Sequence, residues 1–296
     1  VNYQLVGIIT KLKDEYISVN TDSNKYQIIE LFKEAHPYIS RETVFETICP
    51  YAILSENLCG SHINRLIDCI KTVSDDLYDG IIITHGTDTL QYSAAAIDLA
   101  FPSAKLPIIF VSSNYILNDE RANGLDNFTL AVEYIKVKNT PGVYVSYDSQ
   151  MLKGITLLPH IAYSDKLYSI DVTSDTDQNF FESLTDKNIN DIKLSEDAPI
   201  LYLKAVPGQI YPQPDNNKIK AILLETYHSG TLGTDNNSLT CFCEVAYKLN
   251  IPIYIVGVEE RDQYESTSHY EKLHLHVLKH ISPVTAYMKL WFLYSI

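Results

Sequence analysis

Short apolar runs alternate with amphipathic segments along the first half of the chain. Each run is rich in aliphatic and β-branched residues, which predicts strands at 3–9, 44–53, 80–84, 106–113 and 142–148. Helical 3–4 spacing of apolar residues predicts helices at 25–35, 61–73 and 125–137, and an Ala-rich helix follows residue 89. Ser61 is the expected N-cap of the second helix. Because "GIIIT" is continuously apolar, we expect a mainly parallel sheet covered by helices on both faces.

The same alternation continues on a smaller scale near the C-terminus. Strands are predicted at 199–206, 221–227 and 252–258, and helices at 238–250 and 282–296. Ser282 and Pro283 have the residue types of an N-cap and a first helical position. The stretch 171–198 is acidic and polar, which is typical of a linker.

The predicted fold class is therefore α/β, with two domains. We expect a larger N-terminal domain (1–185) with a mainly parallel sheet flanked by helices. A linker (186–198) and a smaller C-terminal α/β domain (199–296) follow it.

Composition restricts the partners and the compartment. The 296 residues carry a formal net charge of −14, which argues against nucleic acid or an anionic membrane as the main partner. Five cysteines form no CxxC pair, which favours reduced thiols in a cytoplasmic protein over a disulfide framework. We expect neither a signal peptide nor a segment long enough to cross a membrane.

The strongest chemical signal is "HGTDT", residues 85–89, at the turn between a predicted buried strand and a helix. Ligands of parallel sheets bind beyond the carboxyl ends of the strands, and the next helix points its free N–H groups there. Gly86 lets the backbone approach a ligand closely. Thr87 offers a nucleophilic or proton-relaying hydroxyl, and Asp88 a carboxylate for a substrate ammonium group. The alternative is that these residues are ordinary N-caps.

The stretch "THGTDTL" resembles the second signature of the bacterial-type L-asparaginases. "LSENL" (54–58), "ANGLDNFTLAV" (122–132), "AILLETYHSG" (221–230), "PIYIVGVEE" (252–260) and "SPVTAYMKLWFLYSI" (282–296) are similar to other parts of that family in order and spacing. The resemblance covers most of the chain.

This resemblance implies hydrolysis of the side-chain amide of asparagine, or of a related small amide, without a metal or cofactor. It assigns Thr87 and Asp88 to a hydroxyl-based catalytic group, and Asp88 also to the substrate amino group. Ser55 and Glu56 would hold the substrate's α-carboxylate and amino ends, and Ser229 would line the site from the second domain. It also implies a homodimer or homotetramer.

Two elements of the family pattern differ in this chain. The first signature, Thr-Gly-Gly-Thr-Ile, corresponds to "LVGIITKL" (5–12), where Thr10 is the hydroxyl nearest the expected nucleophile. The family lysine falls near Leu158 or Pro159, neither of which moves a proton. A hydroxyl without a base is a poor nucleophile. Two hypotheses follow: an amidohydrolase that uses Thr87 or Thr10, or a catalytically impaired relative that binds a small amino-acid-like ligand.

Late histidines form the other candidate cluster. His276 and His280 would share a helix face, which suits a metal, but no acidic ligand has the expected spacing, so a solvated helix face is favoured. Cys241 and Cys243 are interpreted as core residues of a helix.

Overall fold

The computed structural model describes residues 3–9, 27–171, 189–215, 217–258 and 264–296. It divides into two compact units, Val1–Ser169 (unit 1) and Ile170–Ile296 (unit 2). The predicted domain boundary at residue 185 lies outside the described residues, so it stays a prediction.

Unit 1 is built on a six-stranded sheet in the order β2-β1-β3-β4-β5-β6. Neighbours among the first five strands are parallel, and β6 pairs antiparallel with β5. The strands are β1 (Tyr3–Ile9), β2 (Thr43–Ile48), β3 (Gly80–Thr84), β4 (Pro107–Val111), β5 (Gly142–Tyr147) and β6 (Gln150–Lys153). Every residue of β4 is buried, as expected for a strand covered on both faces.

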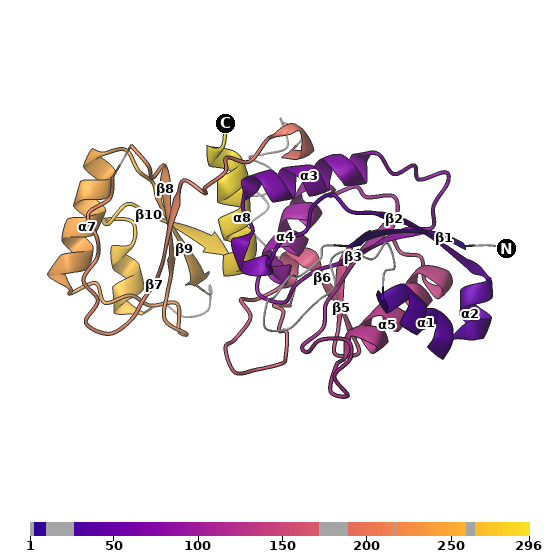
Figure 1. Ribbon diagram of the computed structural model, residues 1–296. Helices are drawn as coiled ribbons and strands as arrows, with labels where there is room; N and C mark the ends of the chain where they lie inside the picture. The colour runs from indigo at the N-terminus through magenta and orange to yellow at the C-terminus, as the bar shows by residue number, and fades with distance from the viewer. Residues whose placement is uncertain (1–2, 10–26, 172–188, 216, 259–263) are drawn as a thin grey trace. The chain divides into compact units, whose positions relative to one another are not determined.

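Helices cover both faces of this sheet (Figure 1). On one face lie α1 (Gln27–Ala35), α2 (Pro37–Arg41) and α5 (Gly124–Val137), and on the other α3 (Gly60–Lys71) and α4 (Leu90–Ala100). Phe32 of α1 and Phe128 of α5 pack edge to face at 5.5 Å above Ile82 and Ile109 of the sheet. The short helices η1 (Ser55–Asn57) and η2 (Gly154–Thr156) lie in connections.

Unit 2 contains a second, fully parallel sheet in the order β10-β9-β8-β7. Its strands are β7 (Ile200–Lys204), β8 (Ala221–Glu225), β9 (Ile253–Val258) and β10 (Leu275–Lys279). The helices α7 (Asn237–Lys248) and α8 (Pro283–Tyr294) pack on opposite faces (Figure 1). Alternate residues of β8 point to the two helices: Ile222 and Leu224 towards α7, Ala221 and Leu223 towards α8. The remaining short helices are η3 (Ile189–Asp191) and η4 (Glu265–His269).

The predicted fold class is confirmed, and so is the cap of the last helix. Ser282 Oγ accepts the backbone N–H of Thr285 at 3.0 Å, and Pro283 starts α8. Three local predictions were wrong. Cys241 of α7 is exposed rather than a core residue, whereas Cys243 is buried. Helix α3 begins one residue earlier and is capped by Cys59 rather than Ser61. Residues 275–279 form strand β10 rather than a helix, so His276 lies on a strand and His280 just beyond it.

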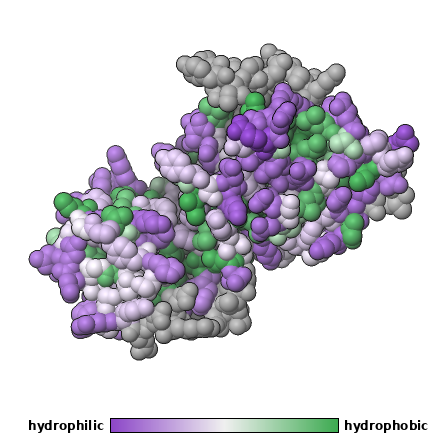
Figure 2. Space-filling view, turned by 90° about the horizontal axis from the view of Figure 1, so that it is seen from below, coloured by the Kyte–Doolittle hydropathy of each residue, from purple (hydrophilic) through white to green (hydrophobic). Residues whose placement is uncertain are grey.

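The described surface is mainly hydrophilic. On the face shown in Figure 2, hydrophilic residues cover most of the described surface, and hydrophobic residues gather in smaller patches. None of the helices in the described ranges combines the length and hydropathy needed to span a bilayer.

Candidate active site

The HGTDT turn leaves the carboxyl end of β3 and enters α4. The backbone N–H of His85 donates to the carbonyl of Val111 at 2.9 Å, which continues the pairing with β4 by one residue. Ser112 Oγ donates to the His85 carbonyl at 2.7 Å. The start of the turn is therefore held on the neighbouring strand through backbone groups.

The His85 side chain is buried beneath the turn. Its Nδ1 lies 2.8 Å from the Gly86 carbonyl, and its Nε2 lies 2.9 Å from Ser93 Oγ on α4. A carbonyl only accepts, so Nδ1 carries the proton and Nε2 accepts from the serine. Burial lowers the pKa of His85, so the ring is neutral and positions the turn. This role of His85 was not predicted, because the partner Ser93 is a residue type with no special sequence signal.

The Asp88 carboxylate makes a contact that links two distant segments. Ser55 Oγ, on η1, donates to Asp88 Oδ2 at 3.0 Å. Thr89 Oγ1 donates to the Ser55 carbonyl at 2.9 Å, which ties the same two segments a second time. Ser55 is 4% exposed, whereas Asp88 is exposed. The structure thus brings together two of the predicted site residues, with the carboxylate accessible to solvent.

The N-cap alternative for Thr87 and Asp88 does not match this geometry. The N-cap of α4 is Thr89, and no side-chain capping hydrogen bond is made there. The Asp88 carboxylate instead accepts from Ser55. Thr87 is half-buried, and its hydroxyl has no hydrogen-bond partner within the described ranges. The side chains of Thr87 and Asp88 therefore do not cap α4.

A hydrogen-bonded network continues along the same edge of the sheet. Asn127 Nδ2 donates to the carbonyl of Ser112 at 2.9 Å, and Asn127 Oδ1 accepts from the N–H of Asp148 at 3.0 Å. Ser146 Oγ donates to the Asn127 carbonyl at 2.7 Å. These bonds link the carboxyl ends of β4 and β5 and make this edge a fixed support for the turn.

The segment expected to carry a lysine holds a histidine. Leu158 and Pro159 are both half-buried, and Lys153 and Lys166 are exposed. His160 follows Pro159, and its ring lies 6.3 Å from that of Tyr147 at the end of β5. His160 Nε2 is shielded from solvent and has no hydrogen-bond partner in the described part of the chain.

The other predicted residues are placed separately. Gly86 is buried and Glu56 is exposed. Ser229 belongs to unit 2, in the turn after β8, where its Oγ lies 3.1 Å from Thr231 Oγ1. Thr10 lies outside the described residues.

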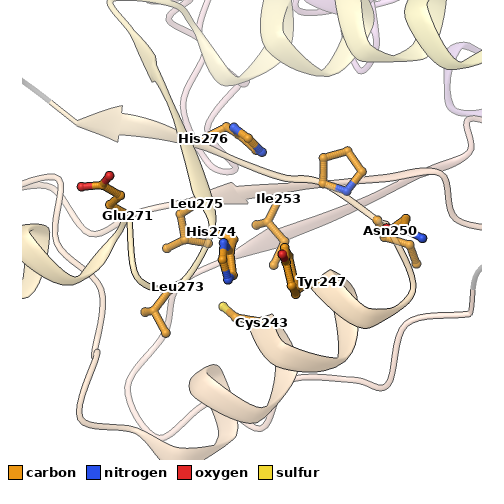
Figure 3. A pocket seen from close by; sticks show the side chains of 11 residues that line it. Cys243, Tyr247, Asn250, Ile253, Glu271, Leu273, His274, Leu275 and His276 are labelled. Carbon is orange, nitrogen blue, oxygen red and sulfur yellow. The ribbon is translucent and has the colours of Figure 1, made fainter.

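Unit 2 contains a pocket of about 440 Å³, which His276 of the late histidine cluster lines (Figure 3). Its lining includes Cys243, Tyr247, Glu271, His274 and His276, with the rings of Tyr247 and His274 stacked at 3.8 Å. It contains none of the predicted site residues. Across the described ranges, His, Cys, Asp and Glu side chains do not gather in threes as a metal site requires.

Sequence comparison places half of the chain in a known family. The family model described as "Asparaginase, N-terminal" matches residues 11–158. An L-asparaginase of Thermococcus kodakarensis is 32% identical over 79 residues, which are 27% of this chain and 24% of the relative. A subunit of the glutamyl-tRNA(Gln) amidotransferase of Methanococcus maripaludis is 30% identical over 182 residues, 59% of this chain and 38% of the relative. The chain thus spans well under half the length of these curated relatives.

Solved structures with the same fold cover nearly the whole chain. L-asparaginase I of Vibrio cholerae has a TM-score of 0.72 at 16% identity, with coverage of 99% of this chain and 93% of that one. The thermostable L-asparaginase of Thermococcus kodakarensis has a TM-score of 0.67 at 16% identity, covering 98% and 92%. A probable cytoplasmic L-asparaginase of Campylobacter jejuni has a TM-score of 0.66 at 16% identity, covering 97% and 93%. At these identities the likeness concerns the fold.

Proposed function

Because the chain belongs to the asparaginase family, we propose that it binds a small amino-acid amide at the HGTDT turn and hydrolyses the side-chain amide. L-Asparagine, or a related small amide, would give a carboxylate and ammonia. Similarity to part of a glutamyl-tRNA(Gln) amidotransferase makes L-glutamine the second substrate to test.

The observation that carries this proposal is the Ser55–Asp88 pair beside Thr87. Ser55 Oγ orients the Asp88 carboxylate at 3.0 Å, and the carboxylate stays exposed. An exposed, oriented carboxylate suits the ammonium group of an amino acid. The half-buried Thr87 hydroxyl precedes it by one residue, without a hydrogen bond within the described ranges. The proposed amine-binding carboxylate and the proposed nucleophile thus belong to consecutive residues of the turn.

The proposed roles follow from this arrangement. Thr87 or Thr10 attacks the amide carbon, and its proton passes to the departing ammonia. Water then hydrolyses the acyl-enzyme to the carboxylate and restores the hydroxyl. Ser55 and Glu56 hold the amino and α-carboxylate ends, and Gly86 permits close approach of the backbone. The chemistry uses no metal or cofactor.

We propose His160 as the base that such a hydroxyl requires. Its Nε2 is buried without a partner in the described part of the chain, beside Tyr147 at the carboxyl end of β5. The carboxyl ends of parallel strands share one edge of the sheet, which also carries the turn after β3. Imidazole is the side chain best suited to proton transfer near neutral pH.

The alternative function is a binding protein for a small amino-acid-like ligand without turnover. The stretch 5–12 carries Ile8 and Ile9 where the family has glycines, and β-branched residues resist the backbone angles that glycine adopts. This observation favours weak or absent catalysis, while the Ser55–Asp88 clasp would still hold a ligand.

The test is ammonia release from L-asparagine and L-glutamine by the purified chain and its variants. Thr87→Ala, Thr10→Ala and His160→Gln are compared with Thr240→Ala, a control on α7 in unit 2. We expect the variant lacking the nucleophile to lose at least ~100-fold in kcat, and His160→Gln a comparable factor. Thr240→Ala should match the unchanged chain.

Each outcome decides between the hypotheses. Turnover that survives in both threonine variants places the chemistry elsewhere. Unchanged turnover in His160→Gln removes that residue as the base. Absent turnover with a thermal shift on adding L-aspartate or L-asparagine favours the binding protein. Absence of both overturns the assignment of the turn as a ligand site.

We further propose a cytoplasmic homodimer or homotetramer that acts on small molecules and not on nucleic acid or membranes. The net charge of −14 supports the choice of partners, and five free cysteines support the compartment. The oligomer is proposed from the family resemblance alone.

A further inference from the structure

Cys59 occupies the N-cap of α3 in direct contact with an imidazole. Its Sγ lies 2.8 Å from His62 Nδ1 and accepts the backbone N–H of the same residue in a capping box. Cys59 is half-buried. The N–H groups at a helix N-terminus favour negative charge on such a sulfur.

The ring nitrogen that faces the sulfur is an acceptor. His62 Nδ1 receives the backbone N–H of Cys59 at 3.3 Å, so this nitrogen carries a lone pair and no proton. A lone pair directed at an S–H group can take its proton when the sulfur attacks an electrophile. Cys59 and His62 therefore have the geometry of a thiol and its base.

A third group points to chemistry at this position. Tyr51 is 6% exposed, and its hydroxyl has no hydrogen-bond partner within the described ranges. Its ring packs on the His62 ring at 5.0 Å. Burial, and to a smaller extent the charge of Cys59, raises the pKa of Tyr51, so the phenol keeps its proton. A buried, unpartnered O–H donor is costly to keep, and this one belongs to a ring that packs directly on His62.

The other cysteines lack this environment. Burial raises the pKa of Cys243 to about 12 and also raises the pKa of Cys69, which makes both thiols less reactive. Cys49 and Cys241 are more exposed than Cys59. Cys49 Sγ donates to the Tyr51 carbonyl. If accessibility alone set the rate, Cys49 and Cys241 would react fastest. If the neighbouring imidazole sets the rate, Cys59 reacts fastest.

We propose that Cys59 is a nucleophilic thiol that exchanges with low-molecular-weight disulfides, with His62 as its base. The sulfur attacks one sulfur of the disulfide, whose S–S bond breaks as the new Cys59 S–S bond forms. His62 takes the thiol proton and returns it to the departing thiol. The electron pair of the broken S–S bond leaves on the departing sulfur, which becomes a thiol, and the other reagent sulfur stays bonded to Cys59, so one disulfide bond replaces another. This site is independent of the proposed amide hydrolysis.

The first experiment uses the unchanged chain. A short exposure to iodoacetamide at neutral pH is quenched, and mass spectrometry of the peptides gives the labelling rate of each cysteine. We expect Cys59 to react at least about tenfold faster than Cys49 and Cys241. A Cys59 rate at or below that of Cys241 overturns the proposal.

The second experiment tests the base and the exchange step. In His62→Gln, the Cys59 rate should fall to about that of Cys241, while the Cys241 rate, an internal control, stays constant. With 4,4′-dithiodipyridine, we expect the unchanged chain to release one equivalent of thiopyridone per chain in a fast phase. The Cys59→Ser variant should show no such fast phase. Melting curves establish that both variants are folded. An unchanged Cys59 rate in folded His62→Gln, or a fast equivalent that persists in Cys59→Ser, contradicts the assignment.

Discussion

Asp98 is a half-buried carboxylic acid of unit 1, on the face of α4 that meets η2. Its Oδ2 accepts the backbone N–H of Ile155 at 3.0 Å. Burial raises the pKa of Asp98 from 3.8 to about 6, and the hydrogen bond from Ile155 and the charge of Lys153 oppose this only in part. The folded chain therefore takes up this proton more readily than the unfolded chain.

The pH dependence of stability follows from that shift. Well below pH 3.8 the group is protonated in both states; as pH rises from 3.8 to about 6 the unfolded chain ionises it in water while burial opposes ionisation in the folded chain, so stability falls. A shift of about 2 units corresponds to about 3 kcal/mol of stability lost across this window. Asp98→Asn cannot ionise, and its amide oxygen can still accept from Ile155. We expect it to gain about 1–3 kcal/mol over the unchanged chain at pH 7.5 and little at pH 4.

Urea unfolding of both proteins at several pH values measures this difference. Glu133→Gln, an exposed charge removal on α5, is the matched control and should show no such trend. A difference for Asp98→Asn that does not grow between pH 4 and pH 7.5 would show that the carboxyl does not titrate as its burial requires.

Helix α8 is the element whose start depends most clearly on one side chain. Ser282 is fully buried, and its Oγ accepts the N–H of Thr285 and donates to the Thr285 hydroxyl at 3.1 Å. Ser282→Ala removes both bonds, so we expect a loss of about 1–2 kcal/mol in the free energy of unfolding. The control Ser103→Ala, at an exposed serine of unit 1, should change the free energy of unfolding by no more than about 0.5 kcal/mol. Equal urea midpoints for the two variants would contradict this prediction and would mean that water replaces the hydrogen bonds of Ser282.

At the scale of the whole molecule, exposed apolar side chains allow a test of the proposed oligomer. Ile161, Tyr163 and Tyr168 are 56%, 109% and 45% exposed within eight residues of one connection. Side chains of this size gathered on a surface are typical of an interface. Light scattering after size exclusion should give two or four times the mass of one chain, and Tyr163→Asp should shift the population towards one chain. A single-chain mass at every concentration tested would exclude the proposed oligomer.

The sequence by itself determined the elements and the position of the turn. Continuous apolar runs predicted strands β3 and β4, and the 3–4 spacing of apolar residues predicted helices α3 and α5. The residue type of Ser282, followed by Pro283, predicted the N-cap of α8. These signals are local, because burial of a strand or helix face imposes a period on neighbouring residues. Strand β10 was not predicted. Leu275, His276 and Val277 alternate in burial, but this alternation is short, and the spacing of His276 and His280 suggested a helix face instead.

Only the tertiary structure decided which polar groups meet. Ser55 and Asp88 are 33 residues apart, and no local pattern says that the serine will donate to this carboxylate. The contact of His85 with Ser93 depends on how α4 packs on the sheet. The contact of Cys59 with His62 depends on the residue at which α3 begins. A side-chain hydrogen bond needs two groups within about 3 Å. Residue types establish which groups can bond, but the folded backbone alone sets that distance.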